Sequence, residues 1–107
     1  MNTNVTIADI TFHISLQELC LNQNISRESI VQMVEYEIVV PLSSKPEQRW
    51  SFDTQSMHWI TKAAQLNRQL EIDWVATAMI IKLLKTQKEL EQENLQLKAI
   101  LDRKLLY

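Results

Sequence analysis

Glycine is absent from all 107 positions of the sequence. Phosphate-binding loops and dinucleotide fingerprints depend on glycine, because their backbone N–H groups approach phosphate where a Cβ atom would clash. The chain therefore lacks the glycine-dependent motifs by which ATP, GTP and NAD enzymes usually bind their nucleotides, and we do not expect it to be such an enzyme. The remaining composition, 46% apolar and 22% charged, suits a folded protein with a buried core, and the length suits one domain.

Residues that could carry catalysis or bind metal are few. The single cysteine, Cys20, excludes an internal disulfide and a cysteine-based zinc site, and we expect it to be a small buried residue. His13 and His58 lack ligand spacing, and no catalytic triad or carboxylate pair has supporting context. We therefore expect a protein that is not an enzyme, with no catalytic residue, metal or cofactor. The absence of an 18-residue apolar run and of a signal region predicts a cytoplasmic protein without membrane contact.

Local signals predict short helices and a small sheet in the first half of the chain. Ser15 and Glu18 form a capping box that begins one helix, and Ser26 caps a second after a polar turn. Two short helices joined in this way indicate a helix-turn-helix. Three segments have strand-like patterns and predict a three-stranded sheet that includes a wing: residues 4–14, 38–40 and 49–52.

Two further helices are predicted in the second half. Asp53 caps a helix that runs to about Leu70, and Trp59 is expected in its buried face. Asp73 caps a helix of about residues 74–104, which would be roughly 45 Å long and would project from a domain of this size. We expect a winged helix-turn-helix domain over residues 1–72 and a dimerisation helix over residues 73–107.

The long helix carries a heptad pattern. Leucine occupies three successive d positions, and the a positions include a polar asparagine, which fixes the register of a coiled coil. The pattern predicts a homodimer; the alternative is that the leucines pack back onto their own domain. The predicted dimerisation residues are Leu83, Leu90, Asn94, Leu97 and Leu101, with Ile80 and Gln87 at the other a positions.

Charge is distributed unevenly along the chain. Residues 1–37 carry one basic and five acidic residues, a net charge of −4, whereas residues 38–107 carry +2. The second predicted helix has Arg27 as its single basic residue, beside Glu28 and Glu35, and Glu37 follows. A DNA-reading helix needs Lys and Arg to meet phosphates and base edges, so this segment favours a basic protein partner over DNA. The alternative is that these carboxylates form only a solvated helix face.

The order of several segments resembles the chaperone-modulatory proteins of the CbpM family, small bacterial relatives of the MerR winged-helix regulators. The segments are ISLQELCLNQNIS, WSFD, LEIDW and LEQENLQLK. The resemblance implies a mainly α protein with a small β wing, a MerR-like winged helix-turn-helix followed by a long C-terminal coiled-coil helix. It also implies binding to the J-domain of a DnaJ-like co-chaperone, CbpA, whose co-chaperone and DNA-binding activities would be inhibited. A bacterial cytoplasmic location follows, with association with the nucleoid through the partner.

J-domains present a basic helix to their chaperone, and the resemblance implies that an acidic surface with exposed aromatics competes for this helix. We predict that the partner-binding residues are Arg27, Glu28, Glu35, Tyr36, Glu37 and Trp74. For Tyr36 and Trp74, packing in the core is the alternative to partner contact. A MerR-like DNA-binding transcription regulator is the alternative function, and a plain dimeric scaffold is the third. We expect no direct nucleic-acid binding.

Overall fold

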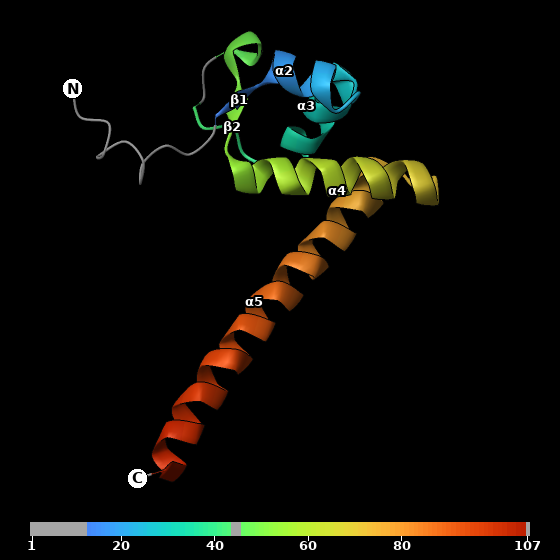
Figure 1. Cartoon of the computed structure of the whole chain (residues 1–107). Coiled ribbons are helices and arrows are strands. Elements are labelled where there is room, and N and C mark those ends of the chain that lie inside the picture. Colours follow the sequence, from blue (N-terminus) through green and yellow to red (C-terminus); the bar gives the residue numbers. More distant parts are fainter. Residues whose placement is uncertain (1–12, 44–45, 107) are drawn as a thin grey trace, which may run out of the picture.

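The computed structural model describes residues 13–43 and 46–106 of the protein, and it is mainly helical (Figure 1). The described elements, in chain order, are β1 (Ile14–Ser15), α2 (Leu16–Asn22), α3 (Arg27–Glu35), the 3₁₀ turn η1 (Glu47–Arg49), β2 (Ser51–Phe52), α4 (Thr54–Leu70) and α5 (Trp74–Leu106). This arrangement of two short helices, a wing, a third helix and a long terminal helix confirms the predicted fold class.

The four helices of the described residues begin where the sequence places their caps. At each N-terminus the cap side chain accepts a hydrogen bond from the backbone N–H three residues later, at 2.8 to 3.1 Å. Glu18 also completes the predicted capping box, since its carboxylate accepts from the backbone N–H of Ser15. These local bonds satisfy backbone donors that the helix itself leaves unpaired. The four caps are Ser15, Ser26, Asp53 and Asp73.

The sheet is smaller than predicted. Strands β1 and β2 pair antiparallel, with Ile14 opposite Phe52, and most of the predicted 4–14 strand lies outside the described residues. The prediction of a strand over residues 38–40 was wrong, and residue 49 lies in η1 rather than in a strand. The N–H of Ile38 donates to a carbonyl at the end of α3, and Pro41 has no N–H to give, so neither of these positions donates a bond to a neighbouring strand.

One core joins all the helices. Its fully buried side chains come from α2, α3, β2 and α4, from the segment after α3 and from the first turns of α5. Trp59 is buried as predicted, whereas Cys20 is only half-buried and packs against the core. The core thereby fixes α5 against the rest of the protein. The largest fully buried apolar side chains are Phe52, Leu19, Ile30, Met33, Ile38, Ile60 and Ile81.

The distal part of α5 extends away from this core (Figure 1). Every residue over 86–105 is exposed. The radius of gyration is 17.7 Å, against about 13 Å for a compact domain of this length. As predicted, the long helix therefore projects. None of the helices in residues 13–43 and 46–106 is both long enough and apolar enough to cross a membrane.

Candidate functional site

The outer side of α3 is acidic. Ile30 and Met33 point into the core, so the 3.6-residue period of the helix places a different set of residues on the opposite side. Glu28 and Glu35 are exposed there, and the Gln32 side-chain amide donates to the Glu35 carboxylate at 3.3 Å. We name this surface the acidic face; its residues are Glu28, Val31, Gln32 and Glu35, followed by the exposed Glu37.

The single basic residue of α3 is already paired within the protein. The Nε of Arg27 donates to Oε2 of Glu47 at 2.7 Å, which ties the start of α3 to η1 in the wing. The hydrogen bond to Glu47 raises the pKa of Arg27, so the guanidinium stays charged. Arg27, Glu28 and Glu47 share a shallow depression of about 270 Å³. The charge that α3 leaves without an internal ion pair is therefore negative.

The chain leaves α3 through a turn that normally uses glycine. The N–H of Glu37 donates to the carbonyl of Val34, and that of Ile38 donates to the carbonyl of Met33, the two bonds of a Schellman motif. The left-handed position of this motif is Glu37, with φ 61°. A residue with a Cβ atom is strained there by about 1–2 kcal/mol. The strain therefore lies at an exposed acidic residue directly after α3.

Replacing Glu37 with glycine should therefore stabilise the fold. Relief of strain exceeds the added chain entropy of glycine, so we expect Glu37→Gly to raise the free energy of unfolding by about 0.5–1 kcal/mol. Glu71, the C-cap of α4 with φ 53°, offers a matched variant, Glu71→Gly, with the same expected gain. Asn24 has φ 54°, and Asn24→Gly should raise the free energy of unfolding by less, because asparagine tolerates this conformation. Urea denaturation measures all three, and a loss of stability in both glutamate variants would contradict the strain argument.

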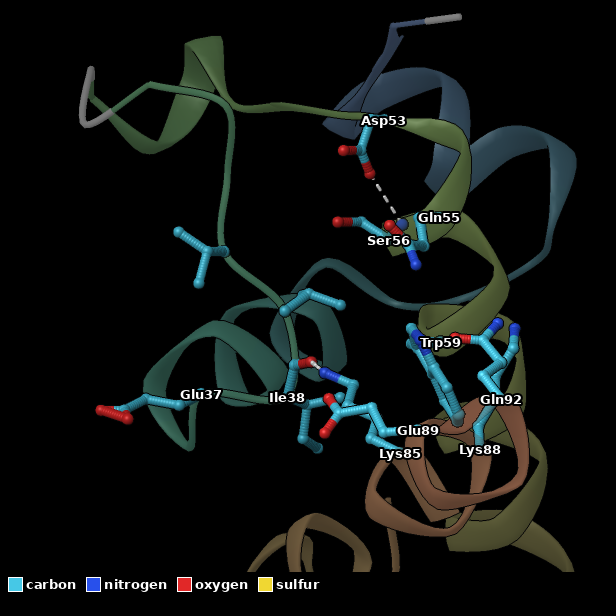
Figure 2. A pocket seen from close by; sticks show the side chains of 12 residues that line it. Glu37, Ile38, Asp53, Gln55, Ser56, Trp59, Lys85, Lys88, Glu89 and Gln92 are labelled. Atoms are coloured by element: carbon cyan, nitrogen blue, oxygen red, sulfur yellow. Dashed lines mark hydrogen bonds between the residues drawn. The ribbon is translucent and has the colours of Figure 1, made fainter. Parts of the chain in front are cut away.

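A groove of about 440 Å³ lies between residues 37–40, the start of α4 and the middle of α5 (Figure 2). The side chain of Lys85 crosses this groove, and its Nζ donates to the carbonyl of Ile38 at 2.7 Å. The same Nζ lies 5.5 Å from the ring centroid of Trp59. Burial lowers the pKa of Lys85. Figure 2 shows the side chain of Glu37 directed away from the groove.

A second depression, of about 350 Å³, lies between the end of α3 and α5. It is lined by Tyr36 and Glu37 on one side and by Met79 and Lys82 on the other. Tyr36 is 42% exposed, so it is available as an apolar contact beside an acidic residue. This arrangement places the end of the acidic face directly beside α5.

Five of the six predicted partner-binding residues lie in α3 or directly after it, in two groups. Arg27 and Glu28 lie at its start, and Glu35, Tyr36 and Glu37 at its end, about 12 Å apart along the helix axis. Trp74 lies elsewhere, at the first residue of α5, where it is half-buried and packs against the core. It lines neither depression beside α3.

Sequence reasoning missed Lys85 and the pairing of Arg27 with Glu47. Lys85 lies four residues after the buried Ile81 and hence on the same side of α5. A lysine on an otherwise buried helix side is the signal that would have singled it out. The Arg27–Glu47 pair joins residues 20 apart in the chain, and no local pattern indicates it.

The predicted dimerisation residues lie on one exposed side of α5. The leucines at 83, 90, 97 and 101 are 55% to 69% exposed, and Asn94 is exposed between them. Met79 and Val75 extend the same side at spacings of four residues. This side is opposite to the one that carries Ile81 and Lys85. We name it the α5 stripe, consisting of Val75, Met79, Leu83, Leu90, Asn94, Leu97 and Leu101.

Comparison with known proteins identifies the family. A family model described as MerR HTH family regulatory protein matches residues 14–99. A chaperone modulatory protein CbpM from Pseudomonas putida strain W619 is 34% identical over 84% of this chain and 88% of its own. Proteins of the same name from Escherichia coli O1:K1 / APEC and Salmonella arizonae are 31% and 28% identical, each over 91% of this chain and 95% of their own.

The helix-turn-helix, wing and long terminal helix therefore define a MerR-like regulatory protein. Within that class, the chain belongs to the CbpM family of chaperone modulatory proteins. The resemblance seen in the sequence is confirmed. The name of these relatives describes a regulatory role rather than a catalytic one.

Proposed function

We propose that this protein binds the J-domain of a DnaJ-like co-chaperone of the CbpA type through the acidic face of α3. Occupying the J-domain would inhibit the co-chaperone and, with it, the DNA-binding activity of the same partner. Family membership supports a chaperone-modulating role. The observation that carries the proposal is the acidic face itself, whose carboxylates are exposed while the only basic residue of α3 is paired with Glu47.

Charge and apolar contact have different parts in such an interaction. Exposed carboxylates attract a basic helix over a distance of about one Debye length and raise the rate of encounter. Affinity depends more on aromatic anchors that become buried, and Tyr36 is the exposed aromatic residue at the end of the face. Trp74, at the start of α5 and apart from the acidic face, stays a separate proposed contact for the partner.

The match to a MerR family model favours DNA binding as the second candidate function. In proteins of that kind, a recognition helix places Arg, Lys or amide side chains against base edges and phosphates. Here that helix carries Glu28 and Glu35 on its outer side, and Arg27 is engaged by Glu47. The arrangement favours the protein partner over DNA.

We also propose that the protein is a homodimer joined through the α5 stripe. A single helix without packing partners has only marginal stability in water, and the stripe presents apolar side chains over the length of α5. A second copy of the same helix fits the pattern, because leucine recurs at d positions and Asn94 at an a position would fix the register.

Titration of the purified J-domain into the protein, read by calorimetry, tests the proposed function. We expect a dissociation constant in the micromolar range or below, and a weaker interaction as salt is added. The protein should also reduce the stimulation of a DnaK-type ATPase by the full co-chaperone. Absence of binding at tens of micromolar would refute the proposal. Submicromolar, sequence-specific DNA binding at physiological salt would instead support the transcription regulator.

A further inference from the structure

Lys85 differs from the other lysines near it on α5. Lys82 and Lys88 are exposed, whereas Lys85 is half-buried and its ammonium group contacts two distant parts of the chain. It donates to the carbonyl of Ile38 at 2.7 Å and lies 5.5 Å from the ring centroid of Trp59 (Figure 2). It donates to a neutral carbonyl although the carboxylate of Glu89 lies one turn further on. The residue is thus built into the packing of three segments.

The acceptor of this bond belongs to the turn that ends the acidic face. Ile38 follows Glu37 directly, and its N–H and side chain close the end of α3. Glu37 occupies the strained left-handed position of the same turn. Among the described residues, the Lys85 bond is the one side-chain hydrogen bond that joins α5 to the α3 end of the molecule. The Lys85 bond therefore holds the strained turn from the side of α5.

We propose that Lys85 is a positioning residue for partner binding, which holds the turn of residues 36–38 against α5 so that Tyr36 and Glu37 face the partner. This inference rests on the proposed function. A charged donor to a carbonyl makes a stronger hydrogen bond than a neutral donor does, and the indole ring of Trp59 stabilises the same charge. The long methylene stem lets the lysine cross the groove while its head reaches the carbonyl. Lys85 itself touches no partner.

Three variants separate positioning from a general loss of charge. Lys85→Met keeps the stem and removes the donor, Lys85→Arg keeps a charged donor, and Lys62→Met removes one charge from an exposed site on α4. We expect Lys85→Met to weaken J-domain binding about tenfold and to move the backbone amide signals of residues 36–40 in NMR spectra. Lys85→Arg should restore both, and Lys62→Met should change neither.

The outcomes decide the inference separately from the proposed function. Wild-type affinity in Lys85→Met, unmoved signals for residues 36–40, or failure of Lys85→Arg to restore them overturns the positioning role. If the wild-type protein does not bind the J-domain, the proposed function fails, and the positioning role for binding falls with it. The amide signals then still show whether Lys85 places the turn. If Lys85→Met does not fold, the wild-type protein supplies the test. The carbonyl ¹³C signal of Ile38 must then shift as Lys85 titrates, and a signal that does not shift overturns the contact.

Discussion

Reversal of Glu28, Glu35 and Glu37 to lysine is expected to weaken J-domain binding about a hundredfold. Added salt should no longer weaken the binding of this variant. All three side chains are exposed, so lysine is accommodated without burying a charge. The variant changes the face from one that attracts a basic helix to one that repels it. Calorimetric titration at two salt concentrations measures the effect, and circular dichroism checks that the fold is retained.

A second triple variant controls for the change in net charge. Glu71, Glu91 and Asp102 are also exposed, and they lie outside α3. Their reversal to lysine changes the net charge by the same amount but leaves the acidic face intact, so we expect near wild-type affinity. Equal weakening by both variants would show that only net charge matters. Unchanged affinity in the α3 variant would show that the partner binds a different face.

Helix positions could be read from the sequence because the signals that set them are local. A capping side chain bonds a backbone N–H only three residues away, as Asp53 does with Ser56. The long helix and its exposed leucines were predictable for the same reason, since periodicity is a property of a single segment. These features account for the fold class and for the projecting end of α5.

The segment after α3 was not predictable in this way. A run of β-branched residues indicates a strand equally well whether its side chains line a sheet or fill a core. Here Ile38 and Val39 are buried beneath a turn whose left-handed residue is Glu37, a position usually marked by glycine. Without that marker, nothing local indicates that α3 ends in a Schellman motif.

The same distinction between local and distant contacts separates the parts of the candidate site. The acidic character of α3 follows from composition alone. The pairing of its one cation, Arg27, does not follow from composition, because Glu47 reaches Arg27 only through the fold of the wing. The contact between Lys85 and Ile38 spans 47 residues, and it depends on how α5 crosses the core. Charge was therefore predictable, and the contacts that position it were not.

Paired substitutions in the α5 stripe, Leu90→Lys with Leu97→Lys, are expected to convert a dimer into a monomer. Each leucine is more than half exposed in the single chain, and burying such a side chain in a dimer contributes about 1.5–3 kcal/mol. Two copies of two lysines would lose that gain and place like charges together in the seam. We expect the dissociation constant of the dimer to rise at least about a thousandfold, as measured by light scattering at micromolar concentration.

Leu95 supplies the matched control for this variant. It is 68% exposed on the same part of α5, but its position in the heptad is b, outside the a and d positions that form the seam of a coiled coil. Leu95→Lys introduces the same chemistry and should leave the dimer intact, because the side chain stays in water in both states. If Leu95→Lys dissociates the dimer equally, the copies meet through another side of the helix. A monomeric mass for the wild type at micromolar concentration would refute pairing through α5 altogether.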